Sequence, residues 1–116
     1  MKDGFYLIEF AGHAGVGAGM LIFDGGRIYG ADQGGGQYDG QYEFIEATGL
    51  VEVTLRVQMP AGHMSVIGIS QPFDWLLDVT AAMDPDKDRA QIDVQTNVGR
   101  QIVATYRFLR PLPLAA

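Results

Sequence analysis

Glycine is concentrated near the beginning of the chain, where eleven of the sixteen glycines lie between Gly12 and Gly40. They are interleaved with apolar residues, so this segment must bend repeatedly while it still supplies side chains to a core. The runs 15–19 and 34–36 are rich enough in glycine for a phosphate-binding loop, but neither precedes a helix that begins with Lys and Ser or Thr. The pattern therefore favours strongly curved β-structure.

Elsewhere the dominant periodicity is two, which is typical of strands with one buried face. Apolar and polar residues alternate cleanly over 51–58 and again over 92–98. Asp24-Gly25-Gly26 is typical of a tight hairpin turn, and Pro85 occupies the second position of a type I turn. We expect eight strands, over residues 4–10, 16–24, 27–32, 38–45, 49–58, 75–83, 90–98 and 102–109.

These strands predict an all-β fold with little helix, because no segment of eleven or more residues keeps helical spacing. Eight short strands joined mostly by short turns suit an up-and-down antiparallel β-barrel or a small sandwich, and the barrel is favoured because closure removes exposed edges. A length of 116 residues predicts one domain, residues 1–116.

Residues 59–72 interrupt the alternation. Pro60, Gly62, Gly68 and Pro72 surround an apolar segment, 64–69. Three conformations fit this composition: a loop across a barrel mouth, a short irregular strand, or one turn of helix. The apolar content indicates that part of the segment packs against the rest of the molecule.

Composition argues against several classes of function. The net charge is −6, the pI is near 4.6, and the eight basic residues are scattered, so we predict no direct binding to nucleic acid. The absence of cysteine argues against a disulfide framework and fits a reducing compartment. No window approaches the ~20 apolar residues of a membrane helix, and the first residues do not resemble a signal peptide. We therefore expect a cytoplasmic protein that does not enter a membrane.

No residue pattern points to catalysis. His13 and His63 are the only histidines, and they lack the spacing of metal ligands. Ser65 and Ser70 lack the spacing of a nucleophile elbow. Most of the fourteen carboxylates alternate with apolar residues, as on a solvated strand face. We predict no enzymatic activity, no catalytic residue, no metal site and no cofactor.

The N-terminal third carries a family resemblance, and a weaker echo of it lies near the C-terminus. The matching elements are Lys2-Asp3-Gly4-x-Tyr6-x-Ile8-x-Phe10, Gly17-x-Gly19-x-Leu21-Ile22, Gly25, Gly30, Asp32, Tyr38-x-Gly40 and Phe108-x-x-Pro111-Leu112. With these elements the chain resembles the GrlR-like family, bacterial repressors of the global regulator of type III secretion in enteric pathogens. The resemblance implies a lipocalin-like eight-stranded barrel, a homodimer, an apolar interior, and negative regulation of transcription or secretion through protein contact.

This chain departs from the family's pattern in one element. In the enteric repressors, a surface run of alternating Glu and Asp beyond the Tyr-x-Gly element contacts the transcriptional activator, whereas the corresponding stretch 41–49 holds only Glu43 and Glu46. The resemblance therefore transfers the fold more readily than the partner. Glu43, Glu46 and Glu52 are the candidates for contact with a protein partner.

Two functions follow. The first is a non-enzymatic regulator that binds another protein, such as a transcriptional regulator. The alternative is a carrier or sensor that holds a small apolar ligand inside the barrel, since the interior of an eight-stranded barrel is just wide enough either to be filled by side chains or to hold one small molecule. Homodimerisation is favoured by the weakly polar second faces of strands 75–83 and 102–109. The candidates for a ligand cavity or an interface are Tyr6, Tyr42, Phe44, Trp75, Tyr106 and Phe108.

Overall fold

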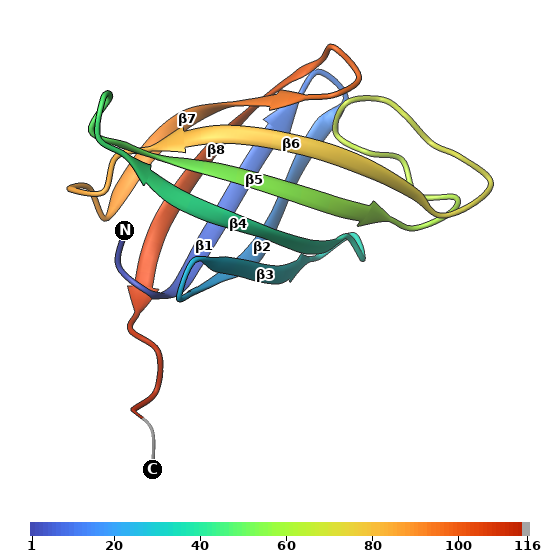
Figure 1. The fold of residues 1–116 in the computed structure, drawn as a ribbon. Helices are drawn as coiled ribbons and strands as arrows, with labels where there is room; N and C mark the ends of the chain where they lie inside the picture. The colour runs from blue at the N-terminus through green and yellow to red at the C-terminus, as the bar shows by residue number, and fades with distance from the viewer. Residues whose placement is uncertain (115–116) are drawn as a thin grey trace.

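A computed structural model describes residues 1–114 as a closed antiparallel β-barrel (Figure 1). The predicted all-β, up-and-down barrel is confirmed, and the described residues contain no helix. Ala115 and Ala116, which the predicted domain includes, lie outside the described residues. Neighbouring strands pair in chain order, and β1 pairs with β8 to close the barrel. The strands are β1 (Gly4–Gly12), β2 (Gly15–Asp24), β3 (Arg27–Asp32), β4 (Gln37–Ile45), β5 (Leu50–Met59), β6 (Trp75–Met83), β7 (Arg89–Thr96) and β8 (Gln101–Arg110).

The strand connections divide the barrel into two ends. The β1–β2, β3–β4, β5–β6 and β7–β8 connections lie at one end, which we call the mouth, and the other three lie at the opposite end (Figure 1). The predicted β2–β3 hairpin turn is present, because Gly25 and Gly26 have φ of 58° and 93°. These left-handed values are accessible to glycine without strain and match the twist of the flanking strands.

Two glycines permit close approach between strands. A Cβ at Gly30 would overlap the carbonyl oxygen of Met20 on β2, and one at Gly40 would overlap that of Thr54 on β5. A backbone atom cannot move aside as a flexible side chain can, so only glycine fits at these points. The observation supports the interpretation of the glycine-rich segment as a source of curvature.

The inward faces of the strands form the core, as the alternation predicts. On β5, Val51, Val53, Leu55 and Val57 are all buried while the residues between them are exposed. The second faces of β6 and β8 are open to solvent in the single chain, where Leu76 is 52% exposed. Closure of the sheet thus satisfies the strand edges but leaves apolar side chains on the outer wall.

The wall is not equally strong around its circumference. Nine residue pairs join β5 to β6, from Val51–Met83 to Met59–Trp75. Only three pairs join β6 to β7 among the described residues, from Val79–Thr96 to Ala81–Val94. The β6–β7 ladder is therefore the shortest in the barrel.

Candidate functional site

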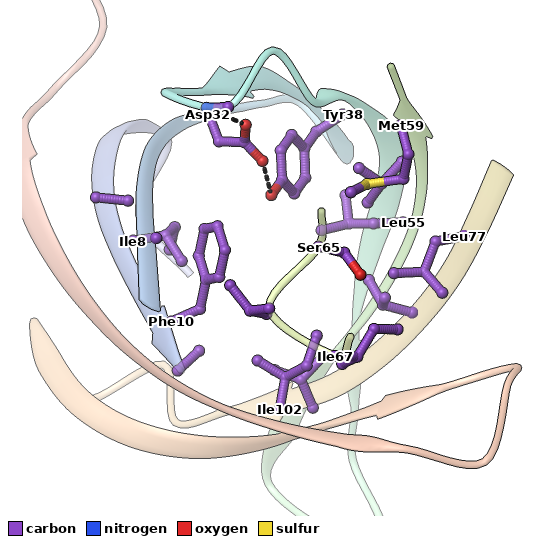
Figure 2. Close-up of a pocket in the computed structure, with 18 of the residues that line it drawn as sticks. Ile8, Phe10, Asp32, Tyr38, Leu55, Met59, Ser65, Ile67, Leu77 and Ile102 are labelled. Atoms are coloured by element: carbon purple, nitrogen blue, oxygen red, sulfur yellow. Dashed lines mark hydrogen bonds between the residues drawn. The ribbon is translucent and has the colours of Figure 1, made fainter. Parts of the chain in front are cut away.

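The barrel encloses a cavity of about 440 Å³ that extends to the mouth. All eight strands contribute to its wall, and the β1–β2, β3–β4 and β5–β6 connections contribute to its rim. Figure 2 shows side chains from opposite walls pointing into this space. Most lining residues are aliphatic or aromatic, including Ile8, Phe10, Leu55, Leu77, Ile92 and Ile102.

The β5–β6 connection, residues 60–74, crosses the mouth and turns inward. Of the three conformations considered for this segment, the structure shows the loop. Ser65 closes a tight turn, because its hydroxyl donates to the Ile69 carbonyl at 2.9 Å and accepts from the Ile69 N–H at 3.1 Å. Gly68 completes the turn with φ of 81°. Ile67 lies at its apex and is fully buried among the lining residues of the cavity (Figure 2).

Two contacts hold this loop against neighbouring turns. The backbone N–H of Ala14, in the β1–β2 turn, donates to the Val66 carbonyl at 2.9 Å. The guanidinium of Arg100, in the β7–β8 turn, donates to the Ile67 carbonyl. These hydrogen bonds give the Val66 and Ile67 carbonyl groups partners within the protein. The loop is therefore a partial roof over the cavity.

The opposite end of the barrel is filled by aromatic side chains. The ring of Tyr6 lies 4.5 Å from that of Phe23, 5.3 Å from that of Phe108 and 6.3 Å from that of Tyr106, measured between centroids. Tyr6 donates its hydroxyl proton to the Lys2 carbonyl at 2.6 Å, and Tyr106 donates to the Asp84 carbonyl at 3.1 Å. Burial away from water raises the pKa of both tyrosines, so both stay neutral. This end is packed and closed.

The six aromatic residues proposed from the sequence for a cavity or an interface do not line the cavity. Tyr6, Tyr106 and Phe108 belong to the closed end, and Tyr42 packs beside Phe23 there while its hydroxyl donates to Asp3. Alternation correctly directs these side chains inward, but it does not say at which height in the barrel they lie. The cavity lining is instead mainly aliphatic.

The other two aromatic residues lie at the ends of their strands. Phe44 is 55% exposed near the end of β4, beyond the packed interior. Trp75 begins β6, packs against the edge of the core opposite Met59, and has a buried indole N–H without a hydrogen-bond partner among residues 1–114. A role for either residue in an interface stays a prediction.

A polar pair interrupts the apolar wall near the mouth. Asp32, at the end of β3, and Tyr38, at the beginning of β4, both line the cavity, and the Tyr38 hydroxyl donates to Asp32 Oδ2 at 2.7 Å (Figure 2). Neither is among the six aromatic residues and three glutamates given above as candidate site residues, although Tyr38 is one of the aromatic residues that an inward strand face could place in a cavity. The signal that was available is the spacing of Asp32 before Gly34 and Gly36, which is typical of an aspartate that caps a turn.

The three glutamates proposed for contact with a partner lie on the outer surface. Glu43 on β4 is directly opposite Glu52 on β5, and both are exposed. Glu46 lies in the turn between these strands. Two like charges that face each other across a strand pair destabilise a sheet slightly. The structure thus brings two of the three together, and their binding role stays a prediction.

Comparison with known proteins identifies no related protein. The chain matches no protein-family model, and a search of curated proteins finds no match. The resemblance to the GrlR-like family therefore stays a prediction that rests on the quoted residues. Within residues 1–114, no group of three or more His, Cys, Asp or Glu side chains is placed to hold a metal ion, and no helix could span a membrane.

Proposed function

We propose that the protein binds one small, largely apolar molecule inside the barrel, as a carrier or sensor. The cavity of about 440 Å³ carries this proposal. Ligand sites typically occupy about 300–1,000 Å³ and are mostly apolar with a few polar groups, and the lining here has this composition. At about 30 Å³ per non-hydrogen atom, as in liquid water, the space suits a ligand of roughly fifteen such atoms.

The energetic cost of an unfilled core supports the same proposal. Residual cavities in protein cores destabilise by about 24 cal/mol per Å³, so a sealed void of this size would cost up to about 10 kcal/mol. That is comparable to the whole stability of a typical domain, about 5–15 kcal/mol. Contact with solvent at the mouth reduces this cost, and an occupant would remove more of it by restoring van der Waals contacts.

A pair of adjacent alanines provides the test. Ala81 on β6 is partly buried and lines the cavity, whereas its neighbour Ala82 is exposed on the outer wall. N-phenyl-1-naphthylamine is an apolar fluorescent probe of the expected size. We expect one probe to bind the wild-type protein and Ala82→Phe alike, and Ala81→Phe to weaken binding at least tenfold because its ring takes up space that the probe needs.

Circular dichroism and thermal unfolding would establish that both variants are folded. Equal binding by the two variants would place the probe on the surface and contradict the proposal. No saturable binding by the wild-type protein, to this probe or to the decyl compounds named below, would also contradict it.

The regulatory role implied by the family resemblance is a separate proposal, as is the homodimer. Support for the homodimer comes from apolar side chains on the outer wall, such as Leu76 on β6 and Val103 on β8. An exposed apolar patch on a barrel wall is a common place for association. Ligand binding is the function that the geometry supports best, because a defined cavity carries it.

A further inference from the structure

The polar pair inside the cavity has a fixed hydrogen-bond direction. Oδ1 of Asp32 accepts from the backbone N–H groups of Gly34 at 2.9 Å and Gly36 at 2.8 Å. Oδ2 accepts from the Tyr38 hydroxyl at 2.7 Å. Three donors thus orient the carboxylate, and two of them are backbone groups of the turn between β3 and β4.

The Tyr38 hydroxyl offers only an acceptor to the cavity. Burial away from water and the hydrogen bond to Asp32 raise the pKa of Tyr38, so its proton is retained at neutral pH and is directed at the carboxylate. The hydroxyl oxygen keeps its lone pairs, and Oδ2 of Asp32 has a second acceptor site. A polar group of a ligand at this point would therefore meet acceptors and a negative charge.

Within the described residues, no lysine or arginine compensates that charge at the cavity wall. Within residues 1–114, neither lysine nor arginine lines the cavity, and the other titratable side chain besides Asp32 and Tyr38 is His63. His63 lies at the rim, where a Cβ on Gly34 would meet its imidazole. A carboxylate placed beside Asp32 would face a like charge at low dielectric, with both groups partly desolvated.

We propose that the cavity selects a molecule with an apolar body and a hydrogen-bond donor at one end, an alcohol or a protonated amine, and discriminates against carboxylates. This inference rests on the proposed function and names the ligand chemistry of the same site. The donor group lies against Asp32 and Tyr38 near the mouth. The apolar body extends inward between walls that include Leu77 and Ile102 (Figure 2).

A matched series of decyl compounds tests the selectivity in the wild-type protein. Decylammonium, 1-decanol, decanoate and decyl methyl ether share one chain and differ in charge and in the ability to donate a hydrogen bond. Calorimetry, or displacement of N-phenyl-1-naphthylamine, gives each dissociation constant at 0.15 M and 0.5 M salt. We expect decylammonium and 1-decanol to bind at least tenfold more tightly than decanoate at both salt concentrations, since a site inside the barrel is screened less than the surface.

Asp32→Asn tests the direction of the hydrogen bond. Its amide oxygen must still accept from Gly34 and Gly36, so its NH₂ group faces Tyr38 and donates to the hydroxyl. The Tyr38 proton is then free to point into the cavity. We expect the preference for decylammonium over decanoate to fall at least tenfold, and binding of the acceptor-only ether to tighten roughly three- to tenfold, the value of one hydrogen bond.

Asp39→Asn is the matched control, because Asp39 is exposed on the outer face of β4 and the substitution changes the net charge equally. The preference of Asp39→Asn for decylammonium over decanoate should stay within twofold of the wild-type value.

The inference is overturned if wild-type protein binds decanoate as tightly as decylammonium, or if folded Asp32→Asn keeps the wild-type preference. Binding of all four compounds without preference would overturn this inference alone, whereas binding of none would overturn the proposed function with it. If Asp32→Asn does not fold, the wild-type series still decides.

Discussion

Ile67 offers the sharpest test of how the loop closes the mouth. It lies at the apex of the Ser65–Ile69 turn and is 0% exposed, although the loop that carries it has no regular secondary structure. If the loop is part of the folded core, replacement of this one side chain will lower the free energy of unfolding of the whole protein. If the loop is only a mobile cover, the same replacement will have little effect.

The magnitude follows from the contacts. Ile67→Ala removes three carbon atoms from a fully buried position, and each buried methylene contributes about 0.8 kcal/mol, or about 2.4 kcal/mol in total. In a sealed core a further penalty for the new cavity would be added. Here the space vacated merges with the existing cavity, which extends to the mouth, so this addition is small. We expect a loss of about 2–3 kcal/mol.

Urea unfolding followed by circular dichroism measures this loss. Met64→Ala is the control, because Met64 lies in the same loop and is 58% exposed. It should cost less than about 1 kcal/mol. A loss below about 0.5 kcal/mol for Ile67→Ala, with an unchanged dependence on urea, would show that the loop opens before the barrel unfolds and would refute the packing argument.

Two further predictions concern the tyrosine in the cavity and a glycine in the wall. Tyr38 has a raised pKa in the folded protein and a pKa of about 10 when unfolded, so above pH 10 only the unfolded state loses this proton, and stability falls with rising pH. Tyr38→Phe should therefore reduce the alkaline slope of the unfolding free energy by about 1.4 kcal/mol per pH unit, and identical slopes would contradict the burial of this hydroxyl. Gly30→Ala should destabilise by about 1–3 kcal/mol in thermal unfolding, because the new methyl group overlaps the Met20 carbonyl; a neutral effect would mean that β2 and β3 are further apart than described.

The strands could be predicted from the sequence because a barrel wall follows the two-residue period closely. The residues of β5 alternate between buried and exposed along their whole length, as the sequence pattern requires. The boundaries were less certain: the strand predicted at 90–98 is observed at Arg89–Thr96. It ends early because Asn97 enters a turn and its side chain accepts from the Asp78 N–H.

The site could not be predicted in the same way. Periodicity places a side chain inside the barrel, but it does not say whether the side chain lies at the closed end or at the mouth. Tyr6 and Tyr106 were therefore candidates for the cavity, although they pack at the closed end. The inward turn at Ile67 has no periodic signal, since it depends on hydrogen bonds made by a single serine. Asp32 and Tyr38 meet because the glycine turn between them brings the ends of β3 and β4 together. The sequence signals this turn, but it does not show that both side chains face a cavity.

A closed barrel can widen only if a strand pair separates, and the pair with the fewest hydrogen bonds separates first. That pair is β6 and β7, which are joined by three residue pairs. Val79, Ala81 and Val94 take part in these pairs and also line the cavity. Strain from a guest too large for the interior would not be shared evenly around the circumference. It would concentrate on these few hydrogen bonds, so we expect the shortest ladder of the wall to limit the size of any molecule that binds inside the barrel.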